Sequence, residues 1–313
     1  MKPSAGWYPV KLESPRNGEI TLTWQDLSAA DFTAPFFEDT INQARHQRPE
    51  LRQTSLHELG AIPLSAAVPP SAFIFHTSRS GSTLLMQLLS CLDGSIALSE
   101  PPIIDALLHL DLSDAEKILV LRQVVQAIGQ AHSAGDRHFF VKYDSWHLPW
   151  LPLIREAFPT VPCFFIYRHP VEILWSHHRQ RGSQMVPGLR DLQSLNLVTG
   201  CDHPADLDAF AGRVLEAIFT QALPHIRKGK LIPLGHHQLV AKIETTLVEH
   251  LGITLSKLEQ ERIHHRSHFH SKRREDRYSV EDEGRMPAAL RERFEALTAP
   301  ILMPIFFSLA PSE

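Results

Sequence analysis

A short turn rich in hydrogen-bond donors separates two apolar stretches in the segment FIFHTSRSGSTLLMQLLS, residues 73–90. The turn itself, residues 76–83, contains an arginine, a glycine and several serine and threonine side chains, and it contains no carboxylate. The apolar residues before the turn follow the pattern of a buried β-strand, and those after it follow the spacing of a helix that begins near Ser82. The sequence therefore predicts a strand, a tight turn and a helix N-terminus in direct succession.

Such a turn is suited to binding a cluster of anionic oxygens. A helix N-terminus offers free backbone N–H groups and a partial positive charge. Gly81 lets the backbone approach a ligand closely, and Arg79 adds a planar, charged pair of donors. The hydroxyl groups that supplement these donors belong to Ser80, Ser82 and Thr83. The simpler alternative is a serine-rich helix cap beside a surface arginine.

A second arginine ends another apolar stretch, in FFIYRHPVEILWSHH, residues 164–178. Arg168 ends the predicted strand, and Ser176 lies eight residues later, about two turns into the predicted helix. Both side chains could therefore reach one phosphate at the carboxyl end of the strand. An unrelated arginine and a helical serine are the alternative interpretation.

The elements that must position these residues alternate along the chain from residue 71 onward. Short, β-rich apolar stretches are followed by segments with helical periodicity, which indicates strands covered by helices on both faces. This order predicts an α/β fold with a doubly wound, mostly parallel sheet flanked by helices, in which ligands bind beyond the carboxyl ends of the strands. The predicted strands are residues 72–76, 96–99, 138–143, 162–168 and 230–234.

Residues 1–70 have a different pattern. They are predicted to form an N-terminal extension, a β-hairpin plus a helix, that packs on the core domain of residues 71–313. Two β-rich stretches flank Asn17-Gly18, a strong signal for a hairpin turn. Residues 31–49 then have the pattern of a helix that ends at the proline in position 49.

The composition argues against several classes of protein. The chain has 313 residues and a net charge of −4, so we expect no nucleic-acid partner. The N-terminal residues lack the apolar core of a signal peptide, and no apolar run approaches the ~18 residues of a membrane span. Three widely spaced cysteines form no CxxC pair and predict reduced thiols. These features together predict a cytoplasmic protein.

The turn does not fit the standard Walker loop, which requires a lysine that is absent here. TSRSGSTLL instead resembles the 5′-phosphosulfate loop of sulfotransferases, in the RSG(S/T) form of the carbohydrate and tyrosylprotein enzymes. The segment of Arg168 and Ser176 resembles the 3′-phosphate motif of that family, and the resemblance extends over about residues 71–282. It implies a P-loop NTPase-like sulfotransferase fold and 3′-phosphoadenosine 5′-phosphosulfate (PAPS) as donor. Donor contacts are then implied for Arg79, Ser80, Gly81, Ser82, Thr83, Arg168 and Ser176.

The same resemblance implies catalytic residues. Glu100 lies where the tyrosylprotein-type enzymes have a catalytic glutamate, and Lys142 lies where they have a lysine directed at the phosphosulfate. With Arg79, these residues would stabilise the leaving bisphosphate and take the proton of an acceptor hydroxyl or amine. The basic stretch HSKRRED resembles the segment that folds over the nucleotide and brings Lys272 and Arg273 to the 3′-phosphate.

The sequence leaves the identity of the base open. His147 is the runner-up, because HLP resembles the KxHLP pattern of cytosolic small-molecule sulfotransferases, although it follows Lys142 by five residues rather than two. Asp144 is a third candidate, and Glu100 could instead be a charge at the start of a helix. Packing is the simpler explanation of His76.

A metal cofactor is not expected. The chain has 19 histidines, several of them in IHHRSHFH, but they lack partners at the spacing of a zinc site. Two other functions stay open: a P-loop kinase-like phosphotransferase, which would need the missing loop lysine, and a non-catalytic nucleotide-binding protein. The sequence predicts neither the acceptor nor the oligomeric state. Residues 1–70, 101–135 and 183–205 are expected to build the acceptor face.

Overall fold

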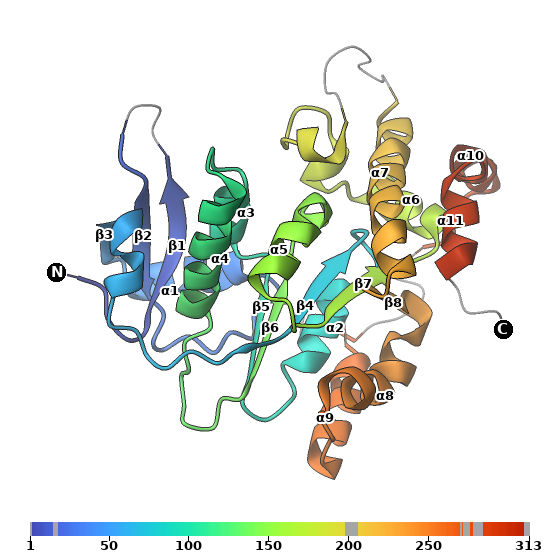
Figure 1. The fold of residues 1–313 in the computed structure, drawn as a ribbon. Coiled ribbons are helices and arrows are strands. Elements are labelled where there is room, and N and C mark those ends of the chain that lie inside the picture. Colours follow the sequence, from blue (N-terminus) through green and yellow to red (C-terminus); the bar gives the residue numbers. More distant parts are fainter. Residues whose placement is uncertain are drawn as a thin grey trace.

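Five parallel strands form the central sheet of the computed structural model, which describes residues 2–14, 18–197, 206–269, 271, 276–277 and 284–309. Their order across the sheet is β5-β6-β4-β7-β8 (Figure 1). The predicted doubly wound α/β fold is confirmed, and each predicted strand is present to within two residues at either end. The strands are β4 (Pro70–His76), β5 (Ser95–Ser99), β6 (His138–Lys142), β7 (Cys163–Tyr167) and β8 (Ile232–Gly235).

Helices cover both faces of this sheet because alternate side chains of its strands are apolar on both sides. Ala72 and Ile74 of β4 belong to one apolar cluster and Phe73 and Phe75 to another. The first cluster includes residues of α2 (Ser82–Leu89), α8 (Leu239–Leu251) and α9 (Lys257–Ser267). The second includes residues of α3 (Pro102–Leu108), α4 (Asp114–Ile128), α5 (Leu151–Ala157), α6 (Pro170–Arg179) and α7 (Leu207–Arg227).

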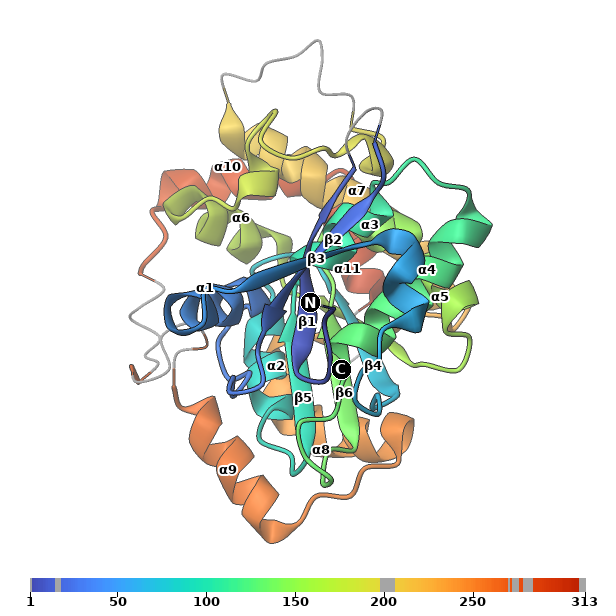
Figure 2. The same cartoon turned by 90° about the vertical axis from the view of Figure 1, so that its left-hand side faces the viewer.

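The N-terminal residues form a separate antiparallel sheet in the order β1-β2-β3, which faces the viewer in Figure 2. β1 (Trp7–Glu13) and β2 (Thr21–Asp26) are the arms of the predicted hairpin. β1 packs on α3 and α4, so Trp7 and Tyr8 join the apolar cluster of the central sheet. The two sheets therefore share one continuous core.

Two details of this region differ from the sequence expectation. The helix predicted for residues 31–49 is shorter, because α1 spans Phe37–Gln47. Pro35 disfavours helical geometry in the residue before it, so the chain up to Phe36 is irregular. The sequence also does not predict β3 (Leu51–Ser55), which pairs with β2.

Two further helices, α10 (Ala288–Thr298) and α11 (Leu302–Leu309), pack against α6 and α7. Short 3-10 turns are η1 (Leu56–Ala61), η2 (Leu148–Trp150), η3 (Ser183–Met185), η4 (Gln193–Leu195) and η5 (His236–Gln238). Within the described ranges, none of the helices combines the length and the apolar character that crossing a membrane requires.

Candidate active site

A cavity of about 660 Å³ opens at the carboxyl ends of β4, β5, β6 and β7. From β4 the chain forms β5 and β6 on one side of this strand and then crosses to form β7 and β8 on its other side. Open α/β sheets bind their ligands at such a topological switch point. The cavity therefore lies where the fold predicts a binding site, and the turn after β4 forms one of its walls.

The turn between β4 and α2 has a strained backbone. Ser78 and Arg79 have φ angles of 64° and 48°, in the left-handed region that non-glycine residues seldom adopt. Among the described residues, five non-glycine residues have a positive φ, and three of them, Ser78, Arg79 and Glu100, line this cavity. Strain of ~1–3 kcal/mol per residue persists only where the surroundings enforce it, and it concentrates at functional sites.

Only glycine fits at position 81. A Cβ atom there would collide with the imidazole of His236 and would lie 2.7 Å from Leu239 Cδ1. Gly81 has a φ of 86° and caps α2, whose first two residues, Ser82 and Thr83, line the cavity. The backbone N–H groups at the start of α2 are thus available to an anionic ligand.

The other two residues of the predicted loop have different positions. Arg79 lines the cavity, and its Nη2 donates a hydrogen bond of 2.7 Å to the carbonyl oxygen of Gln180. Ser80 is fully buried and does not line the cavity, and its Oγ has no hydrogen-bond partner among the described residues. The structure therefore brings four of the five loop residues to the cavity and places the Ser80 side chain in the interior.

Two neighbouring strand ends bring Glu100 and Lys142 into contact. The backbone N–H of Glu100 donates to the carbonyl oxygen of Lys142 at 2.7 Å, which continues the pairing of β5 with β6. Lys142 Nζ lies 2.9 Å from Glu100 Oε1 and donates to Thr83 Oγ1 at 3.2 Å. Glu100 and Thr83 line the cavity, whereas Lys142 is fully buried beside them, with its Nζ 5.0 Å from the centre of the Phe36 ring.

His76, the last residue of β4, completes this group. Its Nδ1 accepts the backbone N–H of Ser78 at 2.9 Å, so Nε2 carries the hydrogen. Nε2 lies 3.1 Å from the carbonyl oxygen of Tyr143 and 3.4 Å from Glu100 Oε1. The sequence interpretation attributes His76 to packing, but the structure places it in the cavity wall beside Glu100. Its position at a strand end is the signal that could have identified it.

The neighbouring charges set the protonation states of this group. Burial would raise the pKa of Glu100, but the Lys142 ammonium and His76 hold that pKa well below its usual range. Burial lowers the pKa of His76, and the nearby Glu100 opposes this effect only partly. At neutral pH the site therefore holds a carboxylate–ammonium pair beside a neutral imidazole.

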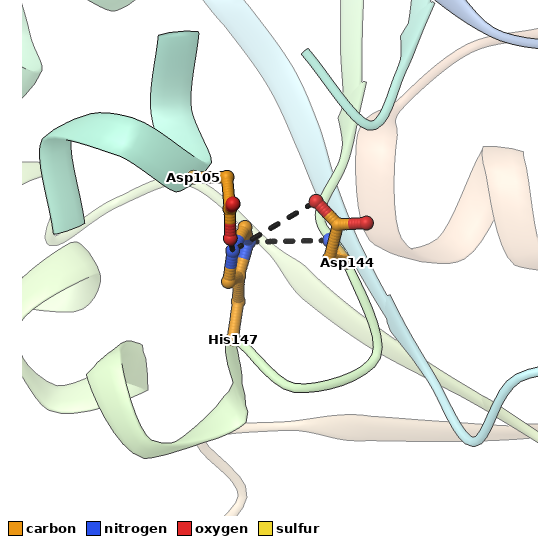
Figure 3. Close-up of side chains that lie close together, drawn as sticks. All are labelled: Asp105, Asp144 and His147. Atoms are coloured by element: carbon orange, nitrogen blue, oxygen red, sulfur yellow. Dashed lines mark hydrogen bonds and ion pairs between the residues drawn. The ribbon is translucent and has the colours of Figure 1, made fainter. Parts of the chain in front are cut away.

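His147, the runner-up base, is buried and does not line the cavity. Its Nδ1 accepts the backbone N–H of Asp144 at 3.2 Å, and its Nε2 donates to Asp105 Oδ1 at 2.7 Å (Figure 3). Trp146 Nε1 donates to the same oxygen at 2.8 Å. Burial would raise the pKa of Asp105, but His147 and Trp146 lower it to about 2. Both nitrogens of His147 are thus engaged in hydrogen bonds, one of them with the Asp105 carboxylate.

Asp105, Asp144 and His147 also form the group of potential metal ligands within the described residues, with three atoms inside 4.8 Å of one another. A metal ion would need the lone pair of His147 Nε2, but this atom carries the hydrogen that is donated to Asp105. Asp105 and His147 thus satisfy each other, and the hydrogen-bonding pattern of the group does not fit a metal site.

The second predicted anion site lies in the same cavity. Arg168 follows β7, Ser176 lies in α6, and both line the cavity wall. The Nε of Arg168 donates to Glu172 Oε2 at 2.7 Å, which orients the guanidinium. Lys272 and Arg273, the predicted contacts to the 3′-phosphate, lie outside the described residues.

Several cavity residues have no signal in the sequence. Gln184 Nε2 donates to Ser78 Oγ at 2.9 Å and so links η3 to the strained turn. The guanidinium of Arg190 lies over the ring of Trp146, 5.1 Å from its centre. Phe36 comes from the N-terminal extension. The three segments expected at the acceptor face, 1–70, 101–135 and 183–205, each contribute lining residues, but no spacing identifies the individual side chains.

Comparison with known proteins gives matches at the level of structure. No protein-family model matches the chain, and no curated protein is significantly similar to it in sequence. The sulfotransferase domain from the curacin biosynthetic pathway is 14% identical with a TM-score of 0.48, over 79% of this chain and 99% of that one. For the sulfotransferase domain of the Synechococcus olefin synthase the values are 15%, 0.45, 79% and 97%. For a sulfotransferase from Mycobacterium avium they are 13%, 0.47, 78% and 77%.

These three similar structures are all sulfotransferases. At TM-scores below 0.5 the likeness is one of coarse backbone shape. A function for this chain therefore has to be argued from its own side chains.

Proposed function

We propose that the protein is a sulfotransferase that moves a sulfuryl group from PAPS to a hydroxyl or amine of an acceptor. The observation that carries the proposal is the convergence in one cavity of three groups: the turn of residues 76–83, the Glu100–Lys142 pair, and Arg168 with Ser176. Two anion sites flank a carboxylate and a buried ammonium. This arrangement suits a donor with a phosphosulfate at one end and a 3′-phosphate at the other.

In the proposed reaction an acceptor oxygen or nitrogen attacks sulfur, and the bond between sulfur and the 5′-phosphate oxygen breaks. Negative charge then grows on the departing adenosine 3′,5′-bisphosphate, so fixed donors are the main catalytic requirement. Arg79 and the N–H groups that begin α2 would supply them, together with Lys142. Glu100 would take the proton of the acceptor.

The pairing of Glu100 with Lys142 sets a condition on this chemistry. While the ammonium lies 2.9 Å away, it keeps the pKa of Glu100 low, and the carboxylate is a weak base. A bound phosphosulfate would draw Lys142 towards itself and weaken the pair, which raises the basicity of Glu100. Proton abstraction would then depend on the presence of the donor.

Titration calorimetry with adenosine 3′,5′-bisphosphate tests the donor site, with adenosine 5′-monophosphate and ATP–Mg²⁺ in parallel. We expect the bisphosphate to bind at least tenfold more tightly than either of the other nucleotides. Tighter binding of ATP–Mg²⁺ would favour the kinase-like alternative and contradict the proposal.

Release of the bisphosphate from PAPS in the presence of candidate acceptors tests catalysis. Glu100→Gln should lower turnover by ~10²–10⁴ while the folded variant still binds the bisphosphate. Glu244→Gln, which removes an exposed carboxylate of α8, is the matched control. A Glu100→Gln variant with full turnover would exclude Glu100 as the base.

A further inference from the structure

Asp144 is a buried carboxylate that the proposed reaction does not use. It follows Lys142 by two residues, lines the cavity and is only 7% exposed. None of the described residues donates a hydrogen bond to its carboxylate. The basic nitrogen beside it, His147 Nε2, lies 3.8 Å from Oδ2 and gives its hydrogen to Asp105 instead (Figure 3). Buried carboxylates are ordinarily paired or hydrogen-bonded, whereas the Asp144 carboxylate has no direct partner among the described residues and lies at the cavity wall.

Other acidic groups face Asp144 from two neighbouring elements. Glu100 follows β5, and Asp105 lies on α3. Burial is the main cause that raises the pKa of Asp144 well above its ordinary value, and the charges of Glu100 and Asp105 raise it further. The part of the cavity wall that contains Asp144, Asp105 and Glu100, called the acidic corner below, is therefore a region of negative potential.

The cations near this corner are held by other partners. Lys142 is in contact with Glu100 and Thr83. Arg190 lies over Trp146, and its Nε donates to Ser183 Oγ at 3.0 Å. Both cations act on Asp144 through space, but neither forms a hydrogen bond or an ion pair with it in the described structure. Asp144 therefore has no direct cationic partner among the described residues.

We propose that Asp144 and Asp105 form a subsite for a cationic nitrogen of the acceptor, so that the acceptor is an amino alcohol that carries an ammonium group and a separate hydroxyl. A primary ammonium has three donors, which suits two carboxylates that converge on one corner. An ammonium held in this way is protonated and cannot attack sulfur, so the hydroxyl is the group that receives the sulfuryl group. The role of the hydroxyl rests on the proposed sulfotransferase function, whereas the ammonium site does not.

The basic and acidic side chains then define separate parts of the cavity for the donor and for the acceptor. Arg79 and Arg168 line the part that is suited to the anionic donor, and Asp144 and Asp105 line the part that repels it. A cationic acceptor is drawn to the acidic corner for the same reason. Glu100, beside both parts, lies where it can accept a proton from the acceptor hydroxyl.

Two probes of equal length test the subsite directly: 4-aminobutan-1-ol and butane-1,4-diol, which differ in one ammonium group. Binding of each is measured by NMR titration without nucleotide and again with saturating bisphosphate. We expect the amino alcohol to bind at least tenfold more tightly than the diol. Asp144→Asn should abolish this preference and leave binding of the diol unchanged. Asp111→Asn, an exposed carboxylate outside the cavity lining, should change neither affinity.

A measurement on the unaltered protein complements the variants. Binding of the ammonium ionises Asp144, so the binding enthalpy should depend on the ionisation enthalpy of the buffer, as expected for release of a proton. Glu100, Asp105, Lys142, Arg190 and His147 are the other titratable groups around Asp144, and the Asp144→Asn variant should lose this dependence.

The outcomes separate this inference from the proposed function. Equal affinity for the two probes, or a preference that survives in Asp144→Asn, overturns the ammonium subsite. Absence of bisphosphate binding to the unaltered protein overturns the donor assignment instead. A probe preference that depends on Asp144 supports the subsite in either case.

Discussion

The ammonium nitrogen of Lys142 lies 2.9 Å from the carboxylate oxygen Oε1 of Glu100, and the lysine is fully buried. Buried ion pairs contribute little net stability, because the loss of hydration offsets most of the attraction. Removal of one partner is nevertheless strongly destabilising, since it leaves the other charge uncompensated. A pair of this kind at the wall of a cavity is better explained by a part in the proposed reaction than by a contribution to folding stability.

The two charges should therefore depend on each other for stability. Lys142→Met and Glu100→Gln are each expected to lower the free energy of unfolding by ~3–5 kcal/mol. The double variant should lose much less than the sum of the two, because it leaves no unpaired charge. Chemical denaturation of the four proteins measures this coupling. Additive losses would show that the contact has no energetic role.

Arg79 combines a charge with a strained backbone, and two variants separate these properties. Both Arg79→Ala and Arg79→Gly remove the guanidinium and should weaken bisphosphate binding by ~1.5–3 kcal/mol. Because φ is 48° at this position, the glycine variant should be more stable than the alanine variant by about 1 kcal/mol. Calorimetric titration and thermal denaturation measure the two effects. Unchanged affinity in both variants would place the 5′ site elsewhere.

Arg168 should determine the preference for a donor with a 3′-phosphate. A site built for a dianion leaves its cation unpaired when that group is missing, so discrimination is expected to be large. Arg168→Ala should reduce the preference for PAPS over adenosine 5′-phosphosulfate at least tenfold, by weakening PAPS and leaving the poorer donor almost unaffected. Arg213→Ala, on the exposed side of α7, is the control. Steady-state kinetics with each donor measure this preference. Equal losses of kcat/KM for both donors would contradict the assignment of Arg168 to the 3′-phosphate.

The sequence predicts the site residues that lie at or just after the ends of strands. Arg79, Glu100, Lys142 and Arg168 each follow or end an apolar stretch, and parallel strands bring such positions to one edge of the sheet. The hydrophobic pattern that identifies these strands depends on burial of both faces. In β3 only Thr54 is buried, so its stretch LRQTS carries too weak a pattern to be recognised.

The parts that the sequence does not predict depend on contacts between distant segments. Asp105 and His147 are 42 residues apart and form a hydrogen bond only because α3 packs beside the turn after β6. The resemblance of HLP to the KxHLP pattern suggested His147 as a possible base, whereas its burial and its two hydrogen bonds are properties of the folded chain. Gln184 and Arg190 reach the cavity from a loop, and the sequence of this loop has no hydrophobic periodicity from which their positions could be predicted.

Asp144 should make the protein less stable as the pH rises. Its raised pKa means that the folded protein keeps a proton that the unfolded chain releases above an ordinary pKa of about 4. Its stabilising contribution is therefore present below about pH 4 and is lost as the pH rises through the raised pKa. Asp144→Asn cannot ionise, so at pH 8 it should exceed the unaltered protein by about 1 kcal/mol, or about 2 °C in Tm. Thermal denaturation of both proteins between about pH 4.5 and 8 should show a gap that closes towards acid pH, with Asp111→Asn unchanged throughout. A variant that is less stable at pH 8 would mean that the folded protein pairs the Asp144 carboxylate, and the acidic corner would then need no cation from a ligand.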